Sequence, residues 1–243
     1  MKKKNYVLSM IMMLVVLICF VFSGCGQQSV GSDSDSEMIG EHMKFGTYQG
    51  EEIEWRVIDA DDKNGKLLLL SEYGLDAKPY HEDSTSDIDW EDCTLRQWLN
   101  GEFYESVFTD AEKEEIVLST SEGFPEHNSR VPGREYIYLE RETEDNIFLL
   151  SYTEVYHYIS NETGDETNPA RLCYPTEYAK NNSDIHIYND TCGWWLGPAH
   201  QGYSDKHDPV VVSSHGAIHV EDDADSREYA VRPAMWIKWQ REK

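Results

Sequence analysis

Two hydrophobic runs near the start of the chain predict a β-hairpin. Residues 53–60 (IEWRVIDA) alternate between apolar and polar side chains, and residues 66–71 (KLLLLS) are almost continuously apolar. Alternation is typical of a strand with one buried face, and a short unbroken apolar run is typical of a strand buried on both faces. Asn64-Gly65 separates the runs and favours a tight turn. We therefore expect two antiparallel strands that meet at this turn.

Helical spacing follows in residues 94–107, where Leu95, Trp98 and Leu99 recur at intervals of three and four. This spacing predicts a helix with one apolar face. Asn100-Gly101 interrupts the pattern, so we expect a second short helical turn after it.

Two capping boxes predict further helices. Thr109 with Glu112 opens a helix to about Val117, and Ser151 with Glu154 opens another through Tyr158. The second helix follows residues 147–150 (IFLL), which we expect to form a buried strand.

The last third of the chain indicates short strands and turns. Residues 210–212 and 217–220 bracket a turn at 213–216, and residues 229–239 (YAVRPAMWIKW) close the pattern. Pro233 makes this last run either an edge strand or a strand split at a bulge. Short strands with few helices favour a single α+β domain over residues 42–243.

The N-terminal segment, residues 1–24, resembles a bacterial lipoprotein signal peptide. Lys2-Lys3-Lys4 precedes an apolar run, which ends in Phe22-Ser23-Gly24-Cys25. This resemblance implies that Cys25 becomes the first mature residue and carries lipid; an unlipidated secretory signal is the alternative. Residues 25–41 read as a flexible acidic Gly/Ser linker. We therefore expect the domain on the extracytoplasmic face of the cell membrane, anchored by lipid.

The net charge of the chain bears on which classes of molecule it can bind. Lys and Arg number 21 against 46 Asp and Glu, which gives a formal net charge of −25. Nucleic acid and anionic lipid surfaces both need clustered basic side chains, so neither is expected as a direct partner of the domain.

Three cysteines follow Cys25 in the chain, namely Cys93, Cys173 and Cys192. In an oxidising compartment they allow one disulfide and one thiol, with three alternative pairings. They are equally consistent with three small buried residues. Their spacing gives no zinc motif.

Several segments together resemble an uncharacterised domain of bacterial surface proteins. They are IEWRVID, TLRQWLN, FLLS, ARLCYPTEYAK, CGWWLG and VRPAMWI. The last two are also similar to segments of C-type-lectin-like bacterial domains. The resemblance implies a C-type-lectin-like fold with a small twisted antiparallel sheet, short helices and long loops. It implies no activity, and Gly197-Pro198 stands where the family usually has Arg-Ser.

Aromatic residues in the C-terminal third are the candidate ligand-binding residues. They are Trp194, Trp195 and Tyr203. Exposed aromatic rings on loops stack on sugars or anchor protein partners. We expect Trp195 and Trp236 to pack in the core, with Trp194 or Tyr203 nearer the surface. Arg232, in an apolar run, is expected to be buried and paired with an acid.

Catalytic and metal-binding patterns are weak. His215, His219 and Glu221 share one face of a predicted strand and could hold a metal, but a hairpin edge with His is more often simply solvated. The acidic turn at 221–225 is expected to be solvated, and no nucleophile motif occurs. We therefore expect neither a metal nor another cofactor. The sequence predicts a non-catalytic binding module for a glycan or a protein; the alternative is a cell-envelope hydrolase that uses carboxylates or a His-bound metal.

Overall fold

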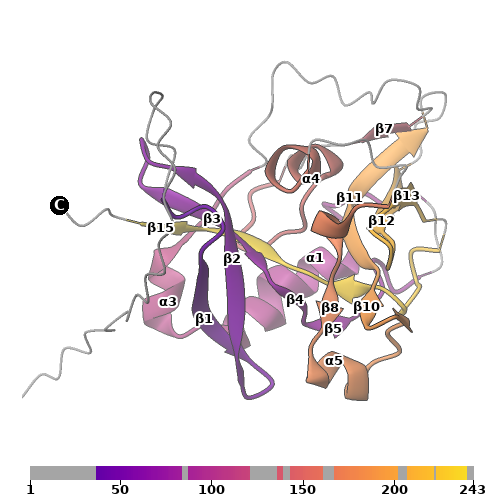
Figure 1. Ribbon diagram of the computed structural model, residues 1–243, viewed down its shortest axis with the longest axis horizontal. Coiled ribbons are helices and arrows are strands. Elements are labelled where there is room, and N and C mark those ends of the chain that lie inside the picture. Colours follow the sequence, from indigo (N-terminus) through magenta and orange to yellow (C-terminus); the bar gives the residue numbers. More distant parts are fainter. Residues whose placement is uncertain are drawn as a thin grey trace, which may run out of the picture. The chain divides into compact units, whose positions relative to one another are not determined.

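Two sheets make up most of the described β-structure (Figure 1). The computed structural model describes residues 37–83, 87–120, 136–138, 143–160, 167–201, 207–221 and 223–239. The contacts within Asp35–Lys243 define one compact unit. The first sheet has five strands in the order β1 (His42–Tyr48), β2 (Glu51–Asp61), β3 (Lys66–Ser71), β15 (Ala234–Lys238) and β6 (Ile116–Val117). All its strand pairs are antiparallel.

The second sheet is centred on β11 (Trp194–Gln201). Its order is β13 (Ile218–Val220), β12 (His207–Val212), β11, β14 (Ala230–Val231) and β5 (Asp76–Ala77), and β7 (Tyr136–Tyr138) also pairs with β11. Two small sheets accompany it: β4 (Tyr73–Gly74) with β8 (Tyr174–Pro175), and β9 (Ile187–Tyr188) with β10 (Thr191–Cys192). The predicted α+β class is confirmed. The β-structure is more extensive than the predicted small sheet, and β11–β14 and β4–β8 are parallel pairs.

Both predicted hairpins form. β2 and β3 pair across the Asn64-Gly65 turn, and β12 and β13 pair across residues 213–216. In the first turn the Asp61 carboxylate accepts hydrogen bonds from the Asn64 backbone N–H at 3.0 Å and from its side-chain amide at 2.6 Å. Gly65 has a φ of 64°, which glycine adopts without strain.

Pro233 splits the last run into β14 and β15, as one of the two alternatives predicted. The edge-strand alternative is wrong, because β15 lies between β3 and β6. Proline has no N–H to donate, but its carbonyl accepts a 2.9 Å hydrogen bond from the Ser71 N–H. This hydrogen bond keeps Pro233 joined to the end of β3 at the point where β14 and β15 separate.

The predicted interruption at Asn100-Gly101 is a change of winding and not a break. α1 (Thr94–Trp98) continues through the π-helix η1 (Leu99–Phe103) into α2 (Tyr104–Val107). The Asn100 amide donates to the Ile147 carbonyl at 2.8 Å and accepts from the N–H groups of Asn146 and Ile147. The wider turn thus carries a polar side chain that binds a neighbouring backbone segment.

Both capping boxes are confirmed, at the starts of α3 (Asp110–Glu115) and α4 (Tyr152–Tyr158). α3 ends two residues before the predicted Val117, because β6 follows it directly. Residues 147–150 are buried as expected, but they form a single bridge, Phe148 to Ala234, and not a strand. The other helices in the described residues are η2 (Pro169–Arg171) and α5 (Glu177–Asn182).

Four tryptophans anchor the core. Trp55, Trp194, Trp195 and Trp236 are each at most 1% exposed. The indole N–H groups of the first three donate to backbone carbonyls at 2.7, 3.0 and 2.9 Å. A buried indole stabilises the core most when its polar N–H is satisfied in this way. The predicted core positions of Trp195 and Trp236 are confirmed.

Candidate functional site

A surface groove lies between the β1–β2 hairpin and α5, and we call it the hairpin groove. It consists of two pockets that share Tyr48 and Tyr178. The first pocket has a volume of about 240 Å³ and is lined by Lys44, Tyr48, Glu51, Glu52, Ile53, Glu54, Tyr73, Leu75, Thr176 and Tyr178. The second has about 360 Å³ and is lined by Thr47, Tyr48, Gln49, Asp76, Lys78, Trp98, Glu102, Phe103, Ser106 and Tyr178.

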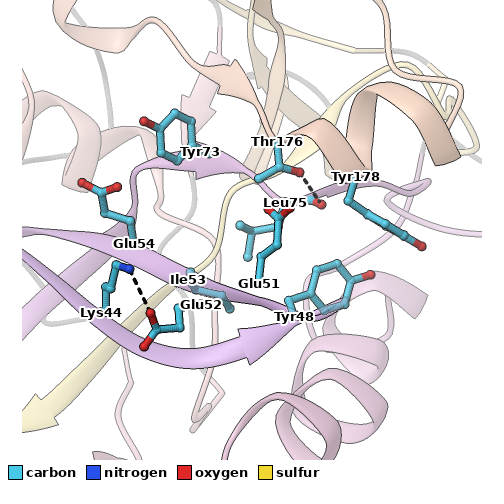
Figure 2. Close-up of a pocket in the computed structure, with 10 residues that line it drawn as sticks. All are labelled: Lys44, Tyr48, Glu51, Glu52, Ile53, Glu54, Tyr73, Leu75, Thr176 and Tyr178. Atoms are coloured by element: carbon cyan, nitrogen blue, oxygen red, sulfur yellow. Dashed lines mark hydrogen bonds and ion pairs between the residues drawn. The ribbon is translucent and has the colours of Figure 1, made fainter.

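The first pocket combines an apolar base with aromatic and charged walls (Figure 2). Ile53 and Leu75 are nearly fully buried, whereas the Tyr73 side chain is 38% exposed. Lys44 Nζ lies 2.8 Å from Glu52 Oε2. This pair is well exposed, so it contributes little to stability and leaves both groups within reach of a ligand.

The second pocket is organised around the buried carboxylate of Asp76 on β5. The Tyr48 hydroxyl donates to Asp76 Oδ2 at 2.6 Å, and Lys78 Nζ lies 3.7 Å from the same oxygen. Burial, followed by the hydrogen bond to Asp76, raises the pKa of Tyr48 well above its usual value, so Tyr48 stays a neutral donor. Lys78 Nζ also lies 4.6 Å from the centre of the Trp98 ring, a cation–π distance.

The turn of the β1–β2 hairpin sets the position of the groove's hairpin wall. Its two central residues, Gln49 and Gly50, both have positive φ values of 52° and 87°. Two such residues favour the tight turn whose twist matches antiparallel strands. Tyr48 and Glu51 therefore lie directly opposite each other where the strands meet the turn.

The opposite wall is set by the start of α5. Thr176 caps this helix by accepting a 3.1 Å hydrogen bond from the Ala179 N–H, and its hydroxyl donates to the Leu75 carbonyl at 3.2 Å. The same side chain thus starts the helix and fixes it to the chain next to β5. Tyr178 then packs edge-on against Tyr48, with ring centres 5.6 Å apart.

The lining of the groove is acidic. The first pocket carries the carboxylates of Glu51, Glu52 and Glu54 against the ammonium of Lys44. The second carries two further carboxylates and one further ammonium group. Together with the net charge of −25, this lining disfavours anionic ligands and favours neutral or cationic ones.

Two of the predicted aromatic site residues, Trp194 and Trp195, do not line this groove. Trp194 and Trp195 are both fully buried on β11. The expectation that Trp194 is near the surface is wrong, because β11 lies between β12 and β14 and the Arg232 guanidinium covers the Trp194 ring at 4.9 Å. Tyr203 lies outside the described residues.

The predicted metal candidates do not converge. The described residues contain no group of three or more His, Cys, Asp or Glu side chains that could hold a metal ion. The His215 ring packs on Tyr188 at 4.7 Å, and His219 lies opposite Val211 in the β12–β13 pair.

Arg232 is buried as expected, but its described hydrogen bonds go to backbone carbonyls and not to an acid. Its guanidinium donates to the carbonyls of Ser71 at 2.9 Å and Glu72 at 3.4 Å. It therefore ties the end of β3 to β14.

Sequence reasoning missed the hairpin groove because its walls come from distant parts of the chain. Tyr48, Asp76 and Tyr178 are widely separated, and none belongs to a recognisable motif. Gln49-Gly50 directly before the alternating run was the one local signal, since it marks a turn with an aromatic and an acidic residue on its two sides.

The chain belongs to a family described as Domain of unknown function (DUF6273), whose model matches residues 64–239. No curated protein and no solved structure matches the chain. The match begins after β2, so Tyr73, Asp76 and Tyr178 fall inside it and the β1–β2 hairpin falls outside. Because β2 pairs with β3, the structural unit extends beyond the matched residues.

The predicted lipid anchor lies outside the described residues, as do the signal peptide at 1–24 and the linker as far as residue 36. Among the residues that the structure describes, no helix has the length and hydrophobicity needed to cross a membrane.

Proposed function

We propose that the chain is a lipid-anchored extracytoplasmic binding module that holds a glycan in the hairpin groove. The observation that carries this proposal is the lining of the groove, where Tyr48, Tyr73 and Tyr178 surround an apolar base beside several carboxylates. Tyrosine faces bury the apolar faces of sugar rings, and carboxylates accept hydrogen bonds from sugar hydroxyl and amide groups. The acidic lining favours neutral or amine-bearing sugars.

The anchoring part of the proposal rests on Cys25 and the basic and apolar residues before it. Since the domain is strongly acidic, lipid rather than charge would hold it at an anionic membrane. Mass spectrometry of the N-terminal peptide from the membrane fraction tests this part. A diacylated or triacylated Cys25, lost in Cys25→Ala together with membrane retention, supports the anchor; an unmodified N-terminus overturns it.

The fold part of the proposal is that the domain is C-type-lectin-like. It rests on the resemblance of two segments. CGWWLG covers the start of β11 in the second sheet, and VRPAMWI runs from β14 in the second sheet into β15 in the first. An experimental structure of this chain, superposed on C-type-lectin-like domains, tests it through the connectivity of these strands.

The binding part is tested by co-sedimentation of residues 37–243 with purified cell-wall sacculi of the host. We expect saturable pelleting that soluble wall glycan competes away. Tyr73→Ala and Tyr178→Ala should each weaken binding by about 10-fold, since a well-placed aromatic contact is worth on the order of 1–2 kcal/mol.

Tyr188→Ala is the matched control, because Tyr188 is 49% exposed but does not line the groove. Equal binding by all three variants would remove the groove from the proposal. If the protein stays in the supernatant, a protein ligand becomes the better explanation than a glycan. If soluble glycan fragments are released, a hydrolase becomes the better explanation than a binding module.

A further inference from the structure

Two buried cysteines face each other beside the hairpin groove. Cys173 and Cys192 form an isolated antiparallel bridge, and the Cys192 N–H donates to the Cys173 carbonyl at 2.9 Å. Opposite residues in such a pair have Cα atoms about 4.5–5.5 Å apart. This separation falls within the range of about 4.4–6.8 Å that a disulfide spans without moving the backbone.

The two sulfur atoms point to the same place. A Cβ placed on Gly74 would lie 3.4 Å from Cys173 Sγ and 3.5 Å from Cys192 Sγ. The Cys192 thiol donates to the Cys173 carbonyl at 3.6 Å, and the Cys173 thiol donates to the Tyr174 carbonyl at 3.9 Å. Position 74 has no room for a side chain, because the same Cβ would lie only 2.6 Å from the Ala230 Cβ.

From this geometry we infer that Cys173 and Cys192 form a disulfide that closes the segment between β8 and β10. Of the three pairings that the sequence allows, only this one joins residues that the structure places opposite each other. Cys93 instead caps α1 by accepting a 3.4 Å hydrogen bond from the Arg96 N–H, and we expect it to stay a thiol. The inference rests on the extracytoplasmic location in the proposed function, because disulfides persist in oxidising compartments, but it does not rest on the glycan.

The disulfide forms by exchange with an external disulfide such as oxidised glutathione. One cysteine thiolate attacks glutathione disulfide and releases one glutathione thiolate; the second cysteine thiolate attacks the mixed disulfide and releases the other. Two cysteine thiols are thereby oxidised and one glutathione disulfide is reduced to two thiols.

In the folded, reduced domain Cys173 is the thiol that ionises more readily. Burial opposes its ionisation, but the adjacent Cys192 thiol and the nearby Arg232 guanidinium outweigh burial and lower its pKa. The adjacent Cys173 thiol, and then burial, raise the pKa of Cys192. Because both side chains are fully buried, exchange takes place before the domain has closed around them, so these folded-state pKa values do not set its order.

The closed segment carries one wall of the hairpin groove. β8, α5 and β10 lie together in one region of Figure 1, and α5 supplies Tyr178 while its N-cap is Thr176. A disulfide limits the freedom of this segment in the unfolded chain and holds its two ends together in the folded one. The groove wall therefore depends on the oxidation state of this pair.

Peptide mapping of the full chain tests the pairing. The chain is dissolved in guanidinium chloride, refolded in mild detergent with reduced and oxidised glutathione, alkylated and cut with trypsin without reduction. We expect one cross-linked product that joins fragment 172–180 to fragment 181–206, with fragment 67–96 alkylated at Cys93. Alkylation of both Cys173 and Cys192, or a cross-link from either of them to fragment 67–96, would overturn the inference.

Thermal unfolding tests the effect on stability. Reduction of the wild-type chain should lower its Tm by about 5–15 °C, as expected for the loss of one disulfide in a domain of this size. Cys173→Ser and Cys192→Ser should unfold near the Tm of the reduced wild type and should not respond to reductant. Cys93→Ser is the matched control and should keep both the cross-link and the response. A cross-linked wild type with an unchanged Tm after reduction would contradict the stabilising role.

Discussion

Arg232 is a single cation that joins two parts of the core. It donates to the carbonyls of Ser71 and Glu72 and lies over the Trp194 ring, while its side chain is almost fully buried. A buried guanidinium loses its hydration, and burial accordingly lowers the pKa of Arg232. Its contacts with the carbonyls and the indole offset part of this loss.

We predict that Arg232→Met lowers the free energy of unfolding by about 1–3 kcal/mol, because it leaves buried carbonyls without their donor. Urea denaturation measures the change. Arg227→Met is the control, since Arg227 forms an exposed ion pair with Glu82 and its loss should change stability by no more than about 0.5 kcal/mol. Equal effects of the two variants would show that burial of Arg232 does not matter to stability.

Glu112 links α3 to β1 through a carboxylate. It accepts hydrogen bonds from the backbone N–H groups of Thr109 at 2.8 Å and Gly46 at 2.9 Å. Partial burial opposes ionisation of this carboxyl, but the hydrogen bonds from Thr109 and Gly46 outweigh burial and hold its pKa below the usual value. A carboxyl with a lowered pKa in the folded state stabilises the fold above its unfolded-state pKa and loses this effect as the pH falls through its folded-state pKa.

We therefore predict that Glu112→Gln is less stable than the wild type at pH 7 and that the difference shrinks as the pH falls below about 4.5. Chemical denaturation at a series of pH values between 7 and 3 measures the difference. Glu115→Gln, at an exposed position on the same helix, should show little difference at any pH. A gap between Glu112→Gln and the wild type that stays constant with pH would contradict this account.

Turns determine how the elements join. Two glycines in turns differ in what an added side chain would meet, so replacing each with alanine distinguishes the cost of backbone strain from the cost of a steric clash. Gly216, in the β12–β13 turn, has a φ of 83°, and an added Cβ would lie 2.2 Å from the Asn168 carbonyl oxygen. Gly40, just before β1, has a φ of 90° and no atom within 4 Å of an added Cβ. Both positions have a left-handed backbone, but only at Gly216 would an added side chain also clash with a neighbouring atom.

We predict that Gly40→Ala costs about 1–2 kcal/mol through strain alone, whereas Gly216→Ala costs more than about 3 kcal/mol because η2 must also move. Thermal or urea denaturation of the two variants gives the comparison. Similar losses would mean that the turn at 213–216 relaxes away from Asn168.

Elements with local signals were predicted from the sequence, and those that depend on distant partners were not. Asn64-Gly65, Thr109 with Glu112 and Ser151 with Glu154 each encode their turn or cap within a few residues, and each forms as predicted. In contrast, β6 forms only because Ile116 pairs with Ile237, and the π-helix at 99–103 presents Asn100 to the backbone of residues 146–147. No local pattern reports such partners.

The candidate site could not be predicted from the sequence, because its residues also come together only in the folded chain. Hydrophobicity suggested that aromatic residues in a loop-rich region would be exposed, but Trp194 lies on the central strand of a sheet and is covered. The groove arises where Tyr48, Asp76 and Tyr178 meet, and this meeting depends on the register of the first hairpin and the docking of α5.

At the scale of the whole molecule, the excess of acidic residues is the dominant electrostatic feature. With a net charge of −25 and a pI near 4.6, the folded chain repels itself more strongly than the expanded unfolded chain does. Dissolved salt screens this repulsion over a distance that falls to about 10 Å at 0.1 M.

We predict that the Tm rises by a few degrees between 10 and 300 mM sodium chloride, because screening relieves more repulsion in the compact state. Differential scanning calorimetry measures the shift. A neutral solute at the same osmolality serves as the control and should reproduce little of it. A Tm that falls with salt would mean that specific ion pairs, and not net repulsion, dominate the electrostatics.

The central place of β15 bears on when the fold can form during synthesis. Trp236 pairs with Leu68 on one side and with Val117 on the other, so the first sheet stays in two pieces until this late strand arrives. A chain emerging from a ribosome would carry β1–β3 as a separate three-stranded piece with an unpaired edge along β3 until residues 234–238 follow. The first sheet would close only when these residues pair with both β3 and β6.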